Sequence, residues 1–106
     1  MNKYGALGQG SPGAATLTDL YAVPVARHAT VKVIACNRSA ATTVRVSLAP
    51  TGGADAVSQY LVYDLALEAN ASQATAPVTC GETDVVRGWS ANGAVSFTVT
   101  GIEADD

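Results

Sequence analysis

Apolar and polar residues alternate along several short segments of the chain, most clearly in residues 94–102, AVSFTVTGI. The apolar residues of that segment fall on one face of a strand, and the serine and threonines between them fall on the other. Residues 42–48 repeat the pattern. An alternation of period two predicts β-strands with one buried and one solvated face. We therefore expect a core that contains Val44, Val46, Leu48, Val95, Phe97 and Val99.

Turn-forming residues separate these segments at the spacing typical of an all-β sandwich or barrel. Pro24 ends the first apolar segment, and Pro50 followed by TGG ends the third. The predicted strands cover residues 17–23, 30–36, 42–48, 60–67, a short stretch near 78, 84–90 and 94–102. The sequence thus predicts one antiparallel β-sandwich over residues 17–106, jelly-roll or immunoglobulin-like, with about seven or eight strands.

The segment CNRS, residues 36–39, lies between two alternating segments and is either a reactive site or a turn. Cys36 shares one strand face with the polar Lys32 and the apolar Ile34, so the alternation does not decide which way the thiol points. The asparagine tolerates left-handed backbone angles, and the serine can hydrogen-bond within a turn. We interpret the segment as a hairpin turn with Arg38 at its tip, open to solvent or to a partner.

The first 16 residues, MNKYGALGQGSPGAAT, contain four glycines and one proline and show little periodicity. Such a segment buries too little apolar surface to become ordered by itself. It is either a frayed terminus or an arm that lies on an adjacent subunit, for example by adding a strand to the edge of a sheet. We expect residues 1–16 to be a flexible N-terminal arm.

Composition and charge exclude several classes of function. The 106 residues are 48% hydrophobic but only 6% aromatic, which indicates a core of small side chains that benefits from a partner surface. The formal net charge is −3 and the six basic residues stand singly, which argues against a nucleic-acid partner. No segment approaches the roughly 20 apolar residues of a membrane span, and no export signal is recognisable. We therefore expect no membrane partner.

The residues that could carry chemistry form no catalytic or metal-binding motif. His28 is the single histidine and has no nucleophile motif to accompany it. Cys36 and Cys80 lack a CxxC arrangement, and we expect reduced thiols, with a disulfide between neighbouring strands as the alternative. The carboxylates between residues 64 and 84 lie in solvated, turn-like contexts. We expect neither enzymatic activity, nor a cofactor, nor a metal.

The lone tryptophan, Trp89, shares a predicted strand with Arg87 and could face either way. One interpretation is core packing. The other is an interface anchor, because Trp and Arg are over-represented where the binding energy of an interface concentrates.

Six motifs lie along the chain, namely the KYGALGQ start, LTDLYAVP, VIACNR followed by VRV, YLVYD, TDVV and the closing SFTVTGIE. Together they resemble a family of small virion structural proteins of tailed bacteriophages. The resemblance extends over nearly the whole chain. It implies an all-β virion protein without enzymatic activity, made in the host cytoplasm and present in many copies.

Within that family we expect a capsid decoration, or cement, protein that binds the outer surface of the head and stabilises it. The alternative is a structural or adhesion module associated with the tail, collar or fibre. The expected partners are the major capsid protein or other virion subunits, together with further copies of the chain in a homo-oligomer. The candidate interface residues are Lys3, Tyr4, Leu7, Gln9, Arg38, Arg87 and Trp89.

Overall fold

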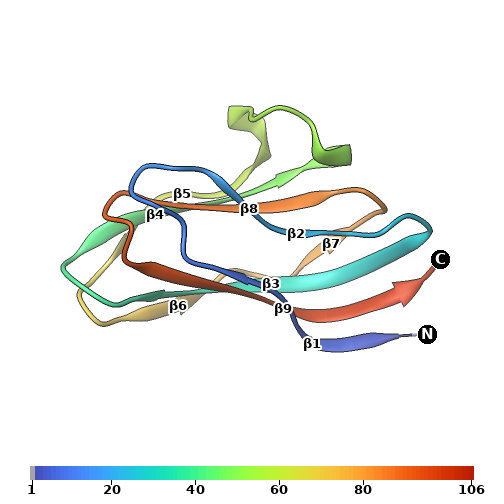
Figure 1. Ribbon diagram of the computed structural model, residues 1–106, viewed down its shortest axis with the longest axis horizontal. Coiled ribbons are helices and arrows are strands. Elements are labelled where there is room, and N and C mark those ends of the chain that lie inside the picture. Colours follow the sequence, from blue (N-terminus) through green and yellow to red (C-terminus); the bar gives the residue numbers. More distant parts are fainter. Residues whose placement is uncertain (1) are drawn as a thin grey trace.

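A computed structural model describes residues 2–106, which form a sandwich of two antiparallel β-sheets (Figure 1). One sheet has the strand order β1-β9-β3-β6, with β7 also paired to β3, and the other has the order β2-β8-β4-β5. The strands of this part of the chain are β1 (Lys3–Gly10), β2 (Thr18–Ala22), β3 (Arg27–Asn37), β4 (Thr42–Ala49), β5 (Tyr60–Leu67), β6 (Ser72–Ala74), β7 (Val78–Cys80), β8 (Val85–Ser90) and β9 (Val95–Asp105). The prediction of an all-β antiparallel sandwich is confirmed.

The strand order is that of a jelly roll. Within residues 2–106, only β4 and β5, and β6 and β7, follow each other in the same sheet, and every other connection crosses between the two sheets. Strands β6 and β7 pair with different parts of β3 and together occupy the position of one strand. Of the two sandwich types that the sequence left open, the structure has the topology of the double-sheet jelly roll.

The N-terminal segment differs from the prediction. Lys3–Gly10 forms β1, which pairs with β9 in a register that runs from Lys3↔Glu103 to Gly10↔Phe97. The expected flexible arm over residues 1–16 is therefore wrong for residues 3–10, and the sandwich begins at β1; residue 1 lies outside the described part. Backbone pairing places this strand in the sheet, while its side chains are mostly exposed. A hydrophobic pattern cannot reveal a strand of that kind.

The connection between β3 and β4 also differs from the prediction. These strands belong to different sheets, so CNRS begins an arch between the sheets and the predicted hairpin is wrong. Asn37 is buried at the end of β3, and its Nδ2 donates hydrogen bonds to the carbonyl oxygens of Ala40, Leu67 and Glu68. Alternation shows which residues face inward, but it does not show which sheet the next strand joins.

The core lies between the two sheets and contains five of the six residues that the sequence placed there, namely Val44, Val46, Val95, Phe97 and Val99. Leu48 packs against this core but is only partly buried, whereas Ser47 and Ala49 are buried. Ser47 and Ala49 face the outer side of the β4–β8 sheet. There the segment with the short 3-10 turns η1 (Pro50–Gly52) and η2 (Val57–Gln59) folds over the sheet (Figure 1). Outward-facing side chains of β4 are therefore covered as well.

Among the residues described, no helix has the length and apolar character needed to cross a bilayer.

Candidate functional site

The seven candidate interface residues lie on two separate surfaces. Four of them belong to β1, at the edge of its sheet, namely Lys3, Tyr4, Leu7 and Gln9. Tyr4 is 67% exposed, while Leu7 is partly buried against the core. Arg38 lies near this edge, because its Nη2 donates a hydrogen bond of 2.6 Å to Oγ of Ser11, just after β1.

Arg87 and Trp89 lie instead on the outer face of the second sheet. The residues between and beside them, Val86, Gly88 and Ser90, are buried on the inner face of β8. Trp89 therefore points away from the core, which rules out the core-packing interpretation. Arg87 forms an ion pair within the chain, with its Nε 2.8 Å from Oδ1 of Asp19.

The structure places an arginine next to Trp89 that the sequence analysis did not single out. The Cζ atom of Arg45 on β4 lies 4.1 Å from the ring centroid of Trp89 and 4.2 Å from that of Tyr63 on β5. Its Nε donates a hydrogen bond of 2.7 Å to Oδ1 of Asp64. Tyr60 packs edge-on against Tyr63, with ring centroids 5.0 Å apart. We call Arg45, Tyr63, Asp64 and Trp89 the arginine stack.

An irregularity in β5 brings Tyr63 and Asp64 to the same arginine. The pairing of β4 with β5 shifts register between Val44 and Val46, and Asp64 has a φ of 53°, in the left-handed region. A regular strand would send two consecutive side chains to opposite faces. A bulge lets both reach Arg45, and aspartate is one of the few residues that tolerate this backbone conformation.

The arginine stack leaves one side of the guanidinium available. The rings of Tyr63 and Trp89 both pack against the guanidinium of Arg45, and its Nε donates a hydrogen bond to Asp64, which raises the pKa of Arg45 above its usual value. Within residues 2–106, no hydrogen bond or ion pair is made by Nη1 or Nη2, and the side chain is 24% exposed. A guanidinium held in this way can bind a carboxylate through two parallel hydrogen bonds.

A cleft opens beside the arginine stack, between β5 and residues 73–76. Its volume is about 370 Å³, and buried core residues, Val33, Val44 and Val46, form part of its lining. Leu61 and Tyr63 also line it and are 42% and 54% exposed. Strands β5 and β6 are the last strands of their sheets on this side of the sandwich. Tyr63 therefore belongs to both the cleft and the arginine stack.

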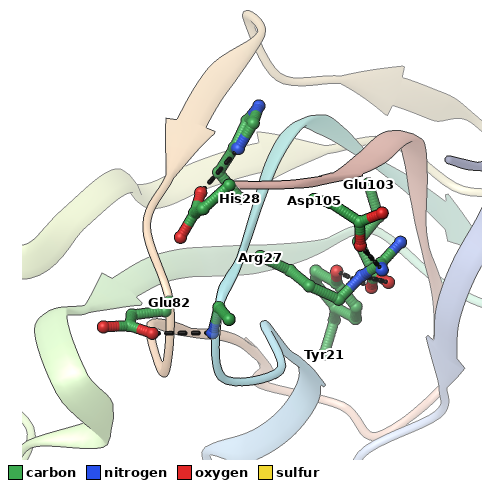
Figure 2. Close-up of polar contacts among 8 residues, drawn as sticks. Tyr21, Arg27, His28, Glu82, Glu103 and Asp105 are labelled. Atoms are coloured by element: carbon green, nitrogen blue, oxygen red, sulfur yellow. Dashed lines mark hydrogen bonds and ion pairs between the residues drawn. The ribbon is translucent and has the colours of Figure 1, made fainter. Parts of the chain in front are cut away.

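A second polar cluster, shown in Figure 2, joins β2, β3 and β9. Glu103 is only 5% exposed; its Oε1 accepts a hydrogen bond from the hydroxyl of Tyr21, and its Oε2 accepts one of 2.6 Å from Nε of Arg27. Arg27 also contacts Asp105 through Nη1. The hydrogen bonds from Tyr21 and Arg27 lower the pKa of Glu103, whereas burial, more than any other cause, raises the pKa of Tyr21. These hydrogen bonds join β2, β3 and β9 around a buried carboxylate.

The neighbouring polar groups in Figure 2 have partners of their own. His28 points away from Glu103, and its Nδ1 lies 2.7 Å from Oδ1 of Asp106. Glu82 accepts a hydrogen bond of 2.7 Å from the backbone N–H of Ala26. In the part of the chain that the structure covers, no three His, Cys, Asp or Glu residues gather as they would around a metal ion.

The two cysteines are free thiols in different environments. Cys36 is exposed, which answers the question that the alternation left open. Cys80 is fully buried, and burial raises its pKa to about 11. A thiol with such a pKa remains protonated at neutral pH and is a poor nucleophile.

The comparisons with known proteins add no relative: no family model, no curated protein and no solved structure matches the chain. The candidate site therefore rests on its own geometry. Arg45 and Tyr63 escaped the sequence analysis because a single arginine and a single tyrosine on two strands carry no local signal of their contact. Only the pairing of β5, β4 and β8 brings them to Trp89.

Proposed function

We propose that the protein is a virion structural protein of a tailed bacteriophage, and that it decorates the outer surface of the head and stabilises it. The motifs from KYGALGQ to SFTVTGIE support a role in phage particles, because they resemble those of small virion structural proteins. The jelly-roll topology agrees with that assignment, although a fold alone does not specify a function.

The observation that carries the binding role is the arginine stack. Trp, Tyr and Arg are the residues in which interface energy concentrates, and here they form one rigid group on the outer face of a sheet. The adjoining cleft exposes apolar surface beside it. Such a surface serves attachment to another protein. In the proposed role, the protein bridges neighbouring capsid subunits, so that pressure from packaged DNA has to break these contacts as well.

The test compares particles with and without the protein. Heads stripped of it should release DNA at a lower temperature, and adding it back should restore the release temperature as the binding sites fill. A dye attached to the exposed Cys36 should appear on the heads when particles are imaged. Equal release temperatures for stripped and decorated heads would refute the cement function. A label confined to tails would favour the alternative of a tail-, collar- or fibre-associated module.

A further inference from the structure

We propose that the arginine stack and the adjoining cleft together bind an extended segment of another virion protein, and that this segment carries an aliphatic side chain close to an acidic one. The aliphatic side chain enters the cleft between β5 and residues 73–76, and the carboxylate binds Nη1 and Nη2 of Arg45. The inference rests on the proposed function in one respect, namely that this face attaches the protein to a virion subunit.

The cleft defines the apolar half of the ligand. Its lining includes Val33, Val44 and Val46 from the core and the partly exposed Leu61 from β5. An apolar cavity of roughly 150 Å³ already binds benzene, so a cleft of about 370 Å³ has room for an aliphatic side chain with part of its backbone. Hydroxyl groups of a sugar would lose hydration in this cleft.

Arg45 defines the charged half. Its orientation is fixed before any ligand arrives, because the rings of Tyr63 and Trp89 pack against its guanidinium and Asp64 accepts a hydrogen bond from its Nε. Little side-chain entropy then remains to be lost on binding. The open side matches the two oxygens of a carboxylate. A nucleic-acid backbone would require several such cations. The nearby Arg87 does not add one, because it is bound to Asp19.

The sheet edge defines the extended shape of the ligand. Strand β5 pairs with β4 on one side, and among the described strands it has no partner on the other. An extended peptide can add to such an edge through backbone hydrogen bonds while its alternate side chains enter pockets. Tyr63 lies between the cleft and Arg45, so one short segment can reach both.

A selection from a random heptapeptide library on the wild-type protein tests the inference without the phage particle. We expect the selected peptides to share Asp or Glu near Leu, Ile or Val. Synthetic copies should bind at least tenfold more weakly to Arg45→Lys, which retains the charge but not the two parallel hydrogen bonds. They should also bind more weakly to Ala74→Phe, which fills the cleft from an exposed position. Lys32→Arg and Ala41→Phe, two exposed positions outside the cleft, should bind like the wild type.

Several outcomes would overturn the inference: no enriched peptide, enriched peptides without an acidic residue, or unchanged binding by Arg45→Lys. Self-association of the wild type that Arg45→Lys abolishes would identify a second copy of the chain as the ligand instead. Circular dichroism establishes that each variant is folded. Should one fail to fold, NMR of the wild type decides: the peptide must shift the signals of Trp89 and Leu61, and the signals of the exposed Ile102 on β9 must stay in place.

The peptide experiment and the particle experiment distinguish an error in the docking site from an error in the proposed function. If peptides bind as expected but labelled protein stays off the particles, the proposed function is wrong and the docking site stands. If wild type and Arg45→Lys bind heads equally, the docking site is wrong and the proposed function stands.

Discussion

The hydroxyl of Tyr21 donates a hydrogen bond to Oε1 of Glu103 inside the sandwich, across 82 positions of the sequence. Tyr21 belongs to β2 in one sheet and Glu103 to β9 in the other. The contact therefore joins the two layers through a buried carboxylate. Arg27 on β3 completes it from the side, with Nε at 2.6 Å from Oε2.

Glu103 should make the stability of the fold depend on pH. Its pKa is lowered in the folded chain by the hydrogen bonds from Tyr21 and Arg27, relative to about 4.3 in an unfolded chain. This contribution to the free energy of unfolding is fully present above the unfolded pKa, and it is lost as the pH falls through the folded pKa. We expect Glu103→Gln to lower the free energy of unfolding by about 1–3 kcal/mol at neutral pH. Urea unfolding of the wild type and of Glu103→Gln measures this difference in free energy.

The same experiment near pH 3 is the control for this prediction. There the difference between wild type and Glu103→Gln should be smaller, because pH 3 lies below the unfolded pKa of about 4.3, and the unfolded wild-type chain is stabilised by binding a proton at Glu103. An equal difference at both pH values would show that Glu103 acts through packing alone.

Phe97 should be among the most sensitive core positions. It is the only phenylalanine in the chain, and its side chain is 1% exposed between the sheets. Phe97→Ala should lower the free energy of unfolding by about 3–5 kcal/mol, because it removes apolar contacts and leaves a cavity. Ile102→Ala on the same strand is the matched control. Ile102 is 47% exposed, so its substitution should lower the free energy of unfolding by less than about 1 kcal/mol. Similar losses for both variants would contradict the assigned faces of β9.

The two thiols should differ in reactivity. An aromatic disulfide reagent should modify Cys36 in the folded protein and reach Cys80 only after unfolding in denaturant, because Cys80 is fully buried and its pKa is raised to about 11. The amount of released chromophore counts the thiols. Cys36→Ser should abolish the reaction of the folded protein, whereas modification of two thiols under native conditions would refute the burial of Cys80.

Strand β1 should stabilise the free protein. Removal of residues 1–10 deprives β9 of its neighbour from Phe97 to Glu103 and removes the packing of Leu7 against the core. We expect a loss of roughly 2–5 kcal/mol in the free energy of unfolding, from several backbone hydrogen bonds of about 0.5–1.5 kcal/mol each. Tyr4→Ala, a change at an exposed side chain, should have little effect. A truncated chain as stable as the full one would show that β1 contributes nothing outside an assembly.

The sequence predicted those parts of the fold in which side chains alternate. Val95, Phe97 and Val99 are buried as expected, and the same holds for Val44 and Val46. β1 was missed because backbone pairing defines it, and the β3–β4 arch was missed because alternation does not identify the sheet that a strand joins. Glu103 did have a signal, since it continues the inward alternation of Val99 beyond residue 102, where the predicted strand ended.

Of the four residues of the arginine stack, the sequence analysis named only Trp89 as a candidate interface residue. The partners of Trp89 depend on the pairing of three strands and on the bulge at Asp64. A bulge shifts which side chains share a face, and no regular period in the sequence records it. Arg45 lies on the polar side of the alternating segment 42–48. In the fold its guanidinium packs against the rings of Tyr63 and Trp89.

The central place of β9 has a consequence for synthesis on the ribosome. β9 lies between β1 and β3 in its sheet, but it follows both of them by most of the length of the chain. Until β9 has been translated, β1 has no strand to pair with in this sheet, and β3 can pair only with the short strands β6 and β7. Folding of this sheet is therefore a late, cooperative event dominated by distant pairing, which is slow and leaves nascent chains prone to associate with one another.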